Sequence, residues 1–316
     1  MDNLTVTSSP HFRSNNSTSK IMLYVILALL PTTVVGCVYF GINAVLVVLT
    51  GVVFAVLSEY IYEKIMKQPI TVGDLSAAVT GLLLALNLPS TTPLWMVALA
   101  SAISIIVVKQ LFGGIGCNFA NPALVGRIVI TLCFTSETSK FIEPFVNANV
   151  DATAGATLLN SIAANEKLPE LWRVFLGLHA GCIGEVCSLA LIVGGVFLVV
   201  TRVINPAIPL SYILTTYLFT TALGYDGLYG ILSGGLLLGA IFMATDYVTS
   251  PLTVKGKIIF GIGCGVITTV IRIFGSNAEG VSYAIVFMNV LTPLIDNLTA
   301  KKSPFAKPNK KEAKAK

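Results

Sequence analysis

A short polar stretch, "DATAGAT" at residues 151–157, lies inside an otherwise apolar chain. Gly155, flanked by two alanines, leaves the backbone open, while Thr157 offers a hydroxyl and Asp151 a nearby carboxylate. Esterification of such a hydroxyl through a phosphate would attach a bulky anionic group. The plainer interpretation is a loop followed by a helix, "TLLNSIAAN", with Thr157 as its N-cap. Because small-residue turns are common, the residues alone favour that interpretation.

Three carboxylates lie within or at the ends of apolar runs, where charge is costly and usually functional. Asp74 opens "GDLSAAVTG", Glu185 lies in "GCIGEVCSLA", and Asp246 closes a run at "ATDYVTSP". For Asp74 and Asp246, helix capping at the membrane interface is as good an explanation as a functional role. Glu185 has apolar residues on both sides and little partner charge near it in the sequence. We therefore treat all three as candidates for an ion path, with Glu185 the strongest.

Histidine and cysteine usage limits the metal chemistry of the chain. It has two histidines and six cysteines, and the cysteines are dispersed through apolar segments without a C-x-x-C motif. Packing in the core is the first interpretation of such cysteines. An iron–sulfur cluster ligated jointly with a partner chain is the alternative. We predict no metal site, and no residue that is catalytic in this chain alone.

The composition predicts that a membrane positions these residues. Of 316 residues, 55% are hydrophobic and 11% charged, and the mean hydropathy is +0.84, whereas soluble domains carry about a quarter charged residues. Crossing a hydrocarbon core of about 30 Å takes about 20 helical residues, which gives about ten spans here. The predicted spans are 21–41, 44–62, 73–88, 93–111, 121–135, 176–200, 208–223, 228–245, 257–273 and 281–298.

Several predicted spans are short or broken by Gly and Pro. The clearest are "GDLSAAVTGLLLALNLP" and "GGIGCNFANPALVGR". Such breaks are tolerated only where the freed backbone is buried in protein or lines a cavity. In addition, "GLLLALNLPSTTPL" at 81–94 echoes "GLLLGAIFMATDYVTSPL" at 235–252, and two halves of five spans would be inverted relative to each other. The sequence predicts an all-α integral membrane protein, with weak evidence for internal duplication.

Basic residues in short loops set the orientation, because they accumulate on the cytoplasmic side. The tail "AKKSPFAKPNKKEAKAK" and the turn with Lys64 and Lys67 are basic. With an even number of spans, both termini are then cytoplasmic. The connection at about 136–172 is acidic and falls on the outer face together with "DATAGAT".

The chain divides into one membrane domain and two short arms. We predict a cytoplasmic arm at 1–20, a transmembrane domain at 21–298 and a basic cytoplasmic tail at 299–316, which would attract anionic lipid headgroups. The stretch "VVGC" at 34–37 could be a lipoprotein cleavage site. Twenty mostly polar residues precede its apolar run, so a retained first helix is the better interpretation.

Taken together, several stretches resemble a known family. "DATAGAT" resembles the D-x-x-[ST]-G-A-T signal of bacterial flavin transferase targets, in which the last Thr carries FMN as a phosphoester. Ala154 stands where that signal has Ser or Thr, although Thr153 directly precedes it. Nearly the whole chain resembles the RnfD/NqrB family, whose members are membrane subunits of Rnf electron-transport complexes and of sodium-pumping NADH:quinone reductases. The matching stretches, in family order and spacing, are "SPHFRSNNSTSKIML", "GDLSAAVTGLLLALNLP", "GGIGCNFANPALVGR", "GCIGEVCSLALIVGG", "MATDYVTSPLT" and "EGVSYAIVFMNVLTPLID".

The resemblance implies a covalent flavoprotein. FMN would be attached to Thr157, with Asp151, Gly155 and Ala156 completing the signal, and it would relay electrons near the outer face. Rnf complexes pass electrons between reduced ferredoxin and NAD and couple this to Na⁺ or H⁺ translocation. A second, non-covalent flavin is a further expectation. The family fold is similar to that of urea and ammonium channels, with two inverted five-helix halves.

The same resemblance implies the partners and the location. We expect the other Rnf subunits (RnfA, RnfB, RnfC, RnfE and RnfG), a flavin transferase and the lipid bilayer of the bacterial cytoplasmic (inner) membrane, and no nucleic acid. The chain has no G-x-G-x-x-G after a strand and no ferredoxin-type cysteine run, so NAD and iron–sulfur sites would reside on partners. The alternatives are a secondary transporter or channel without a redox role, using Glu185 and the broken helices, and a scaffold whose flavin site is vestigial because of Ala154.

Overall fold

The computed structural model describes residues 17–145, 169–275 and 279–300, and all regular structure within these ranges is helical. The same ranges contain four helices long and apolar enough to cross a membrane. These are α1 (Thr18–Phe40), α2 (Ile42–Ile65), α13 (Val254–Phe274) and α14 (Val281–Thr299). Shorter apolar helices are α3 (Ser76–Leu86), α4 (Leu94–Ile103) with the π-helix η2 (Ser104–Gln110), α5 (Pro122–Cys133) and α9 (Ser188–Val200). The chain is a multi-pass membrane protein.

The remaining elements are short, apart from one helix of intermediate length. They are η1 (Val72–Asp74), α6 (Thr135–Thr138), α8 (Leu171–Leu176), α10 (Ala207–Ala222), α11 (Gly227–Leu232), α12 (Leu236–Leu238) and the π-helix η3 (Gly239–Met243).

Two predicted spans differ from the structure. The span expected at 176–200 is helical only from Ser188, because residues 178–187 form turns and bends. The span expected at 228–245 is divided into α11, α12 and η3. Glycine explains both breaks: Gly177 and Gly234 adopt φ values of 90° and 62°, which a continuing helix cannot accommodate.

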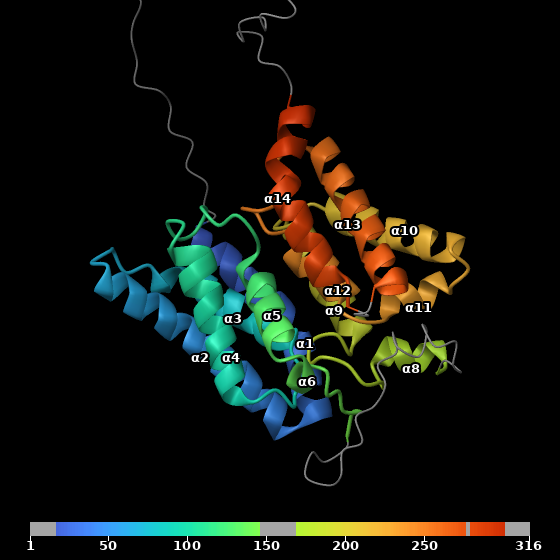
Figure 1. Cartoon of the computed structure of the whole chain (residues 1–316), viewed down its shortest axis with the longest axis horizontal. Helices are drawn as coiled ribbons and strands as arrows, with labels where there is room; N and C mark the ends of the chain where they lie inside the picture. Colours follow the sequence, from blue (N-terminus) through green and yellow to red (C-terminus); the bar gives the residue numbers. More distant parts are fainter. Residues whose placement is uncertain (1–16, 146–168, 276–278, 301–316) are drawn as a thin grey trace, which may run out of the picture.

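The helices run between two sides of the molecule (Figure 1). The start of α1 and the end of α14 lie on one side, which we call the tail side, and α6 and α8 lie on the other, the loop side. On the tail side, the start of α13 meets the end of α14 through a hydrogen bond of 2.7 Å between the hydroxyls of Thr253 and Thr299. On the loop side, the hydroxyl of Tyr39 at the end of α1 donates to the carbonyl of Leu176 in α8, at 3.1 Å.

Local sequence explains where the first helices begin and turn. Ser17 caps α1, because its side chain accepts a hydrogen bond from the backbone N–H of Lys20 at 3.3 Å. Gly41, with φ of 68°, forms the turn between α1 and α2. Small residues then let α2 and α3 approach closely: a Cβ atom on Gly81 would lie 2.4 Å from the carbonyl oxygen of Gly51.

The two segments that echo each other in sequence lie in the interior. Nearly all of α3 is buried, and so are all residues of α12 and η3. They meet where Asn87, at the end of α3, donates from Nδ2 to the carbonyl of Leu83 at 2.8 Å and to the sulfur of Met243 at 3.3 Å. Broken helices therefore lie at the centre of the molecule, where protein covers the freed backbone.

Candidate functional site

One guanidinium gathers buried polar side chains from separate segments of the chain. Arg127 on α5 is 4% exposed. Its Nη1 donates to Asn87 Oδ1 at 3.1 Å and to Ser282 Oγ at 2.9 Å. Its Nη2 donates to Glu185 Oε1 at 3.4 Å and also pairs with Glu279, which precedes α14. We call these five residues the ion-pair cluster.

The start of α5 is fixed to the broken span of the second half. Asn121 caps α5, because its Oδ1 accepts from the N–H groups of Ala123 and Leu124 at 3.1 and 3.4 Å. Pro122 occupies the first turn, where its missing N–H is not needed. The Nδ2 of Asn121 donates to the carbonyl of Met243 at 3.2 Å. This capped start places Arg127 at a defined depth beside α3 and η3.

Glu185 reaches the cluster because its backbone is packed against the end of α3. The N–H of Gly184 donates to the carbonyl of Leu86 at 2.7 Å, and the N–H of Ile183 donates to that of Leu88 at 3.2 Å. A Cβ atom on Gly184 would lie 2.6 Å from the Cβ of Leu86, so this approach requires glycine. Glu185 therefore lies in a non-helical segment inside the protein rather than on a continuous helix.

The ion-pair cluster does not have the chemistry of a metal site. Donor atoms of Cys182, Glu185 and Glu279 lie within 4.8 Å of one another, a spacing that suits a metal ion. However, Arg127 contacts all three, with its Nη2 3.7 Å from Cys182 Sγ. A guanidinium at the centre of a donor set repels a cation, so the cation of this cluster is the arginine itself.

A second buried network lies on the tail side. Lys109, in the π-helix η2, donates from Nζ to Glu59 Oε1 and to Ser76 Oγ, each at 2.5 Å. Gln110 donates to the same Glu59 oxygen at 2.8 Å and to Glu63 Oε1 at 3.5 Å. We call these five residues the lysine cluster. Glu59 is fully buried, and its Oε2 has no hydrogen-bond partner among the described residues.

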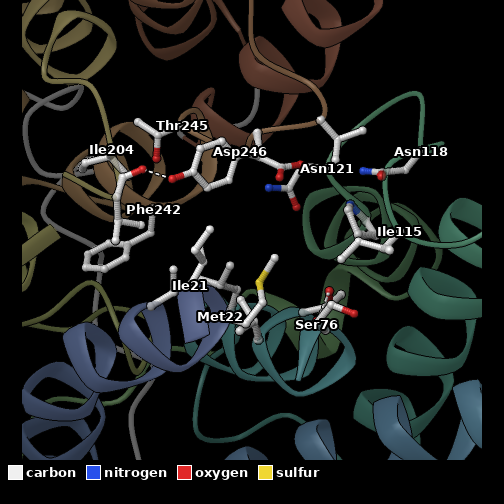
Figure 2. A pocket seen from close by; sticks show the side chains of 18 of the residues that line it. Ile21, Met22, Ser76, Ile115, Asn118, Asn121, Ile204, Phe242, Thr245 and Asp246 are labelled. Carbon is white, nitrogen blue, oxygen red and sulfur yellow. Dashed lines mark hydrogen bonds between the residues drawn. The ribbon is translucent and has the colours of Figure 1, made fainter. Parts of the chain in front are cut away.

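A pocket opens beside the lysine cluster, lined by apolar residues and a polar edge (Figure 2). Ile21 and Met22 of α1 form the wall opposite Asp246, beside which Asn121 lies. Lys109 also lines the pocket. Apolar walls with a few convergent polar groups are typical of small-molecule sites.

The three carboxylates predicted from the sequence lie in three different surroundings. Glu185 belongs to the ion-pair cluster. Asp74 caps the start of α3, because its Oδ1 accepts from the N–H and the hydroxyl of Ser76 at 2.8 and 2.5 Å. Asp246 lines the pocket and accepts from the hydroxyl of Thr249 at 3.1 Å. Asp74 therefore accepts hydrogen bonds at the start of α3, whereas Asp246 lies at the pocket and Glu185 in the ion-pair cluster.

The predicted flavin signal falls outside the described residues. This applies to Thr157, Asp151, Gly155 and Ala156 alike. Among the cysteines, Cys182, Cys187 and Cys264 are buried as the packing interpretation requires, but Cys117 and Cys133 are exposed, so it is wrong for those two.

Sequence reasoning missed the basic partners of the buried carboxylates. Arg127 and Lys109 lie inside the predicted spans at 121–135 and 93–111, and Glu59 lies inside another. Their position within apolar runs was the available signal, because charges inside spans are rarely without function. Glu279 gave no such signal, because it precedes the predicted span at 281–298.

The fold and the buried ion pairs define an all-helical, multi-pass membrane protein with broken helices at its centre. Residues 5–304 match the model of the NQR2, RnfD, RnfE family, and the chain belongs to this family. It is 45% identical, over 99% of both chains, to the D subunit of the Na⁺-translocating ferredoxin:NAD⁺ oxidoreductase complex of Acetobacterium woodii. It is 41% identical, over 93% of this chain and 94% of the relative, to the D subunit of the proton-translocating ferredoxin:NAD⁺ oxidoreductase complex of Clostridium ljungdahlii. The D subunit of an ion-translocating oxidoreductase complex of Escherichia coli is 33% identical, over 93% of this chain and 96% of the relative.

Proposed function

We propose that this chain is the membrane-embedded RnfD component of an Rnf complex, which couples electron transfer between reduced ferredoxin and NAD to ion translocation. The observation that carries the proposal is the similarity along nearly the whole chain to D subunits of such complexes. The coupling ion in this proposal is Na⁺ or H⁺, the ions named for the two relatives, which are 45% and 41% identical to this chain.

For the architecture, we propose two inverted halves of about five spans each, as in urea and ammonium channels. Support comes from the two echoing segments, since α3 and the α12–η3 pair are both short, both buried and in contact through Asn87 and Met243. The start of α1 and the end of α14 lie on the same side, as an even number of spans requires (Figure 1).

For the cofactor, we propose FMN attached to Thr157 on the loop side. Both flanks of that segment are anchored there: the N–H of Phe145 donates to the carbonyl of Tyr39 at 2.8 Å, and the hydroxyl of Tyr229 donates to the carbonyl of Pro169 at 2.7 Å. A bound flavin supplies one- and two-electron chemistry, while the protein orients it. We place a second, non-covalent flavin in the pocket of Figure 2, because apolar walls with a polar edge are typical of small-molecule sites.

For the location, we propose the bacterial cytoplasmic membrane with the tail side in the cytoplasm. Lys64 lies in the last turn of α2 and Lys67 follows that helix on this side, and Lys255 and Lys257 lie in the first turn of α13 there, as the positive-inside rule requires. The arm at 1–20 and the tail at 299–316 would then face the cytoplasm. RnfA, RnfB, RnfC, RnfE and RnfG and a flavin transferase remain the proposed partners.

The decisive experiment is expression in a host with an active flavin transferase, followed by SDS denaturation, in-gel flavin fluorescence and peptide mapping by mass spectrometry. Fluorescence should survive denaturation, map to Thr157 and vanish in Thr157→Ala. The matched control is Thr153→Ala, which changes the neighbouring hydroxyl of the same segment and should leave the fluorescence unchanged.

An unmodified chain, in a host shown to flavinylate a control target, would contradict the flavoprotein proposal and favour a transporter or channel without a redox role. If the wild-type protein is modified but a complex with Thr157→Ala transfers electrons equally well, the result would favour a scaffold. Ala154→Ser tests the departure from the signal directly, because restoring the hydroxyl should raise the modified fraction if Ala154 weakens recognition.

A further inference from the structure

The ion-pair cluster contains more negative than positive groups in direct contact. Among the described residues, Arg127 supplies the one guanidinium of the cluster, whereas Glu185 and Glu279 each contribute a carboxylate. Glu185 is 3% exposed. An uncompensated charge buried in an apolar interior is too unfavourable to persist and is removed by proton uptake or by a bound cation.

Glu185 is weakly compensated for so buried a carboxylate. Its hydrogen bond from Arg127 Nη2 is long, at 3.4 Å, and its other donors are the thiol and the backbone N–H of Cys182, which carry no charge. On the side of Gly235, a Cβ atom would lie 2.7 Å from Glu185 Oε1 and 3.7 Å from Asn87 Oδ1, so the carboxylate packs directly against the glycine. Arg127 is therefore the one cation in contact with Glu185 among the described residues, and it is shared with Glu279.

The geometry favours a proton over a metal cation as the missing positive charge. The neutral oxygens of the cluster, Asn87 Oδ1 and Ser282 Oγ, already accept from Arg127. A metal cation needs several free oxygen ligands and would lie against the guanidinium. A proton needs one carboxylate oxygen, which the Glu185 and Glu279 pair provides.

The cluster has access to the loop side through Glu279. The side chain of Glu279 is 28% exposed, and the residue precedes the start of α14, opposite the tail side. Other ionisable groups that act on the pair electrostatically are Cys182, Tyr283 and Arg272.

Arg272 does not supply the missing charge by contact. Its Nη1 and Nη2 donate to the backbone carbonyls of Gly230 and Ser233 at 2.6 and 3.1 Å. The carbonyl of Gly230 lies inside α11 and that of Ser233 directly follows it, so this second guanidinium neutralises the end of α11.

We propose that Glu185 and Glu279 share one exchangeable proton, with Arg127 as their fixed counter-ion, and that this site exchanges its proton with water on the loop side. On uptake, an O–H bond forms on one carboxylate and the proton comes from loop-side water through Glu279; release reverses this. The inference deepens the proposed function, because it places a proton-binding site inside a subunit of an ion-translocating complex.

The test is the carboxylic acid carbonyl band in infrared difference spectra, recorded between low and high pH on the purified complex in lipid nanodiscs. The wild type should show a pH-dependent band. Glu185→Gln and Glu279→Gln should each lose it entirely, because each leaves one carboxylate paired with one guanidinium and no excess charge. The control Glu143→Gln changes an exposed carboxylate on the loop side and should leave the band unchanged.

Two further variants keep the test informative if a glutamine variant fails to fold. Glu185→Asp retains a carboxylate and should shift the band without removing it. Arg127→Met removes the counter-ion and should make the band about twofold larger, because both carboxylates then need a proton. A wild-type band that persists in both glutamine variants, or no pH-dependent band at all, would overturn the proposal.

Repeating the titration in sodium chloride and in choline chloride distinguishes the two ions. A titration midpoint independent of the salt supports a proton site, and a midpoint that falls as Na⁺ rises would overturn it in favour of a sodium site. In-gel flavin fluorescence on the same preparations separates this inference from the proposed function. Loss of the flavin with the band retained would count against the flavoprotein alone, and the reverse would count against the proton site alone.

Discussion

Replacement of Arg127 by methionine should destabilise the protein more than any change to an exposed ion pair. The substitution keeps an unbranched side chain of similar length but removes the charge that contacts Glu185 and Glu279. Glu185 is 3% exposed and cannot be hydrated in place, whereas the Glu279 side chain is 28% exposed and partly can. Breaking a buried pair in this way typically costs about 3–5 kcal/mol, and we expect most of it to come from Glu185.

Reversible unfolding by SDS in mixed micelles would measure this effect through the free energy of unfolding. The control is Arg173→Met on the loop side, where Arg173 pairs with the exposed Glu170 at 3.9 Å and the loss should stay below about 1 kcal/mol. The double variant Arg127→Met with Glu185→Gln removes both charges, so it should lose only about 2 kcal/mol, the contribution of the hydrogen bonds to Asn87 and Ser282.

The comparison of single and double variants decides whether the reasoning holds. An Arg127→Met variant as stable as Arg173→Met would show that the buried pair contributes little. A double variant less stable than Arg127→Met alone would show that the loss comes from packing and not from an uncompensated carboxylate.

Three further substitutions test the elements that surround the clusters. Gly81→Ala should lower the free energy of unfolding by about 1–3 kcal/mol, because its Cβ would lie 2.4 Å from backbone of α2; Gly73→Ala, where nothing lies within 4 Å, is the control in the same unfolding assay. Lys109→Met should destabilise by about 3–5 kcal/mol through the buried Glu59 carboxylate, and adding Glu59→Gln should recover part of the loss; a double variant no more stable than the single one would contradict the pairing. Asn121→Ala should cost about 0.5–2 kcal/mol, because α5 loses its N-cap, and an unchanged unfolding midpoint would show that the cap is dispensable.

The sequence by itself determined the class of protein and the position of most of the helices. Long apolar runs predict membrane helices because each must satisfy its backbone hydrogen bonds internally, and this depends on residues that are neighbours in the chain. The same local reasoning offered helix capping as one interpretation of Asp74, which lies beside the start of α3, and predicted short helices at α3 and α5. The family motifs were likewise readable, since they are contiguous stretches in a fixed order.

Only the tertiary structure decided which charges meet. Arg127 contacts Glu185 and Glu279 across 58 and 152 residues of chain, and Lys109 contacts Glu59 across 50. Hydrophobic patterns and helix propensities do not predict contacts between residues so far apart in the chain, because the partners meet only when broken helices pack at the centre. Residues 178–187 show the same limit: their apolar composition predicts helix, but glycines and the close approach to α3 hold them in turns. That packing places Glu185 beside Arg127. An unbroken helix through residues 178–187 would not require this contact.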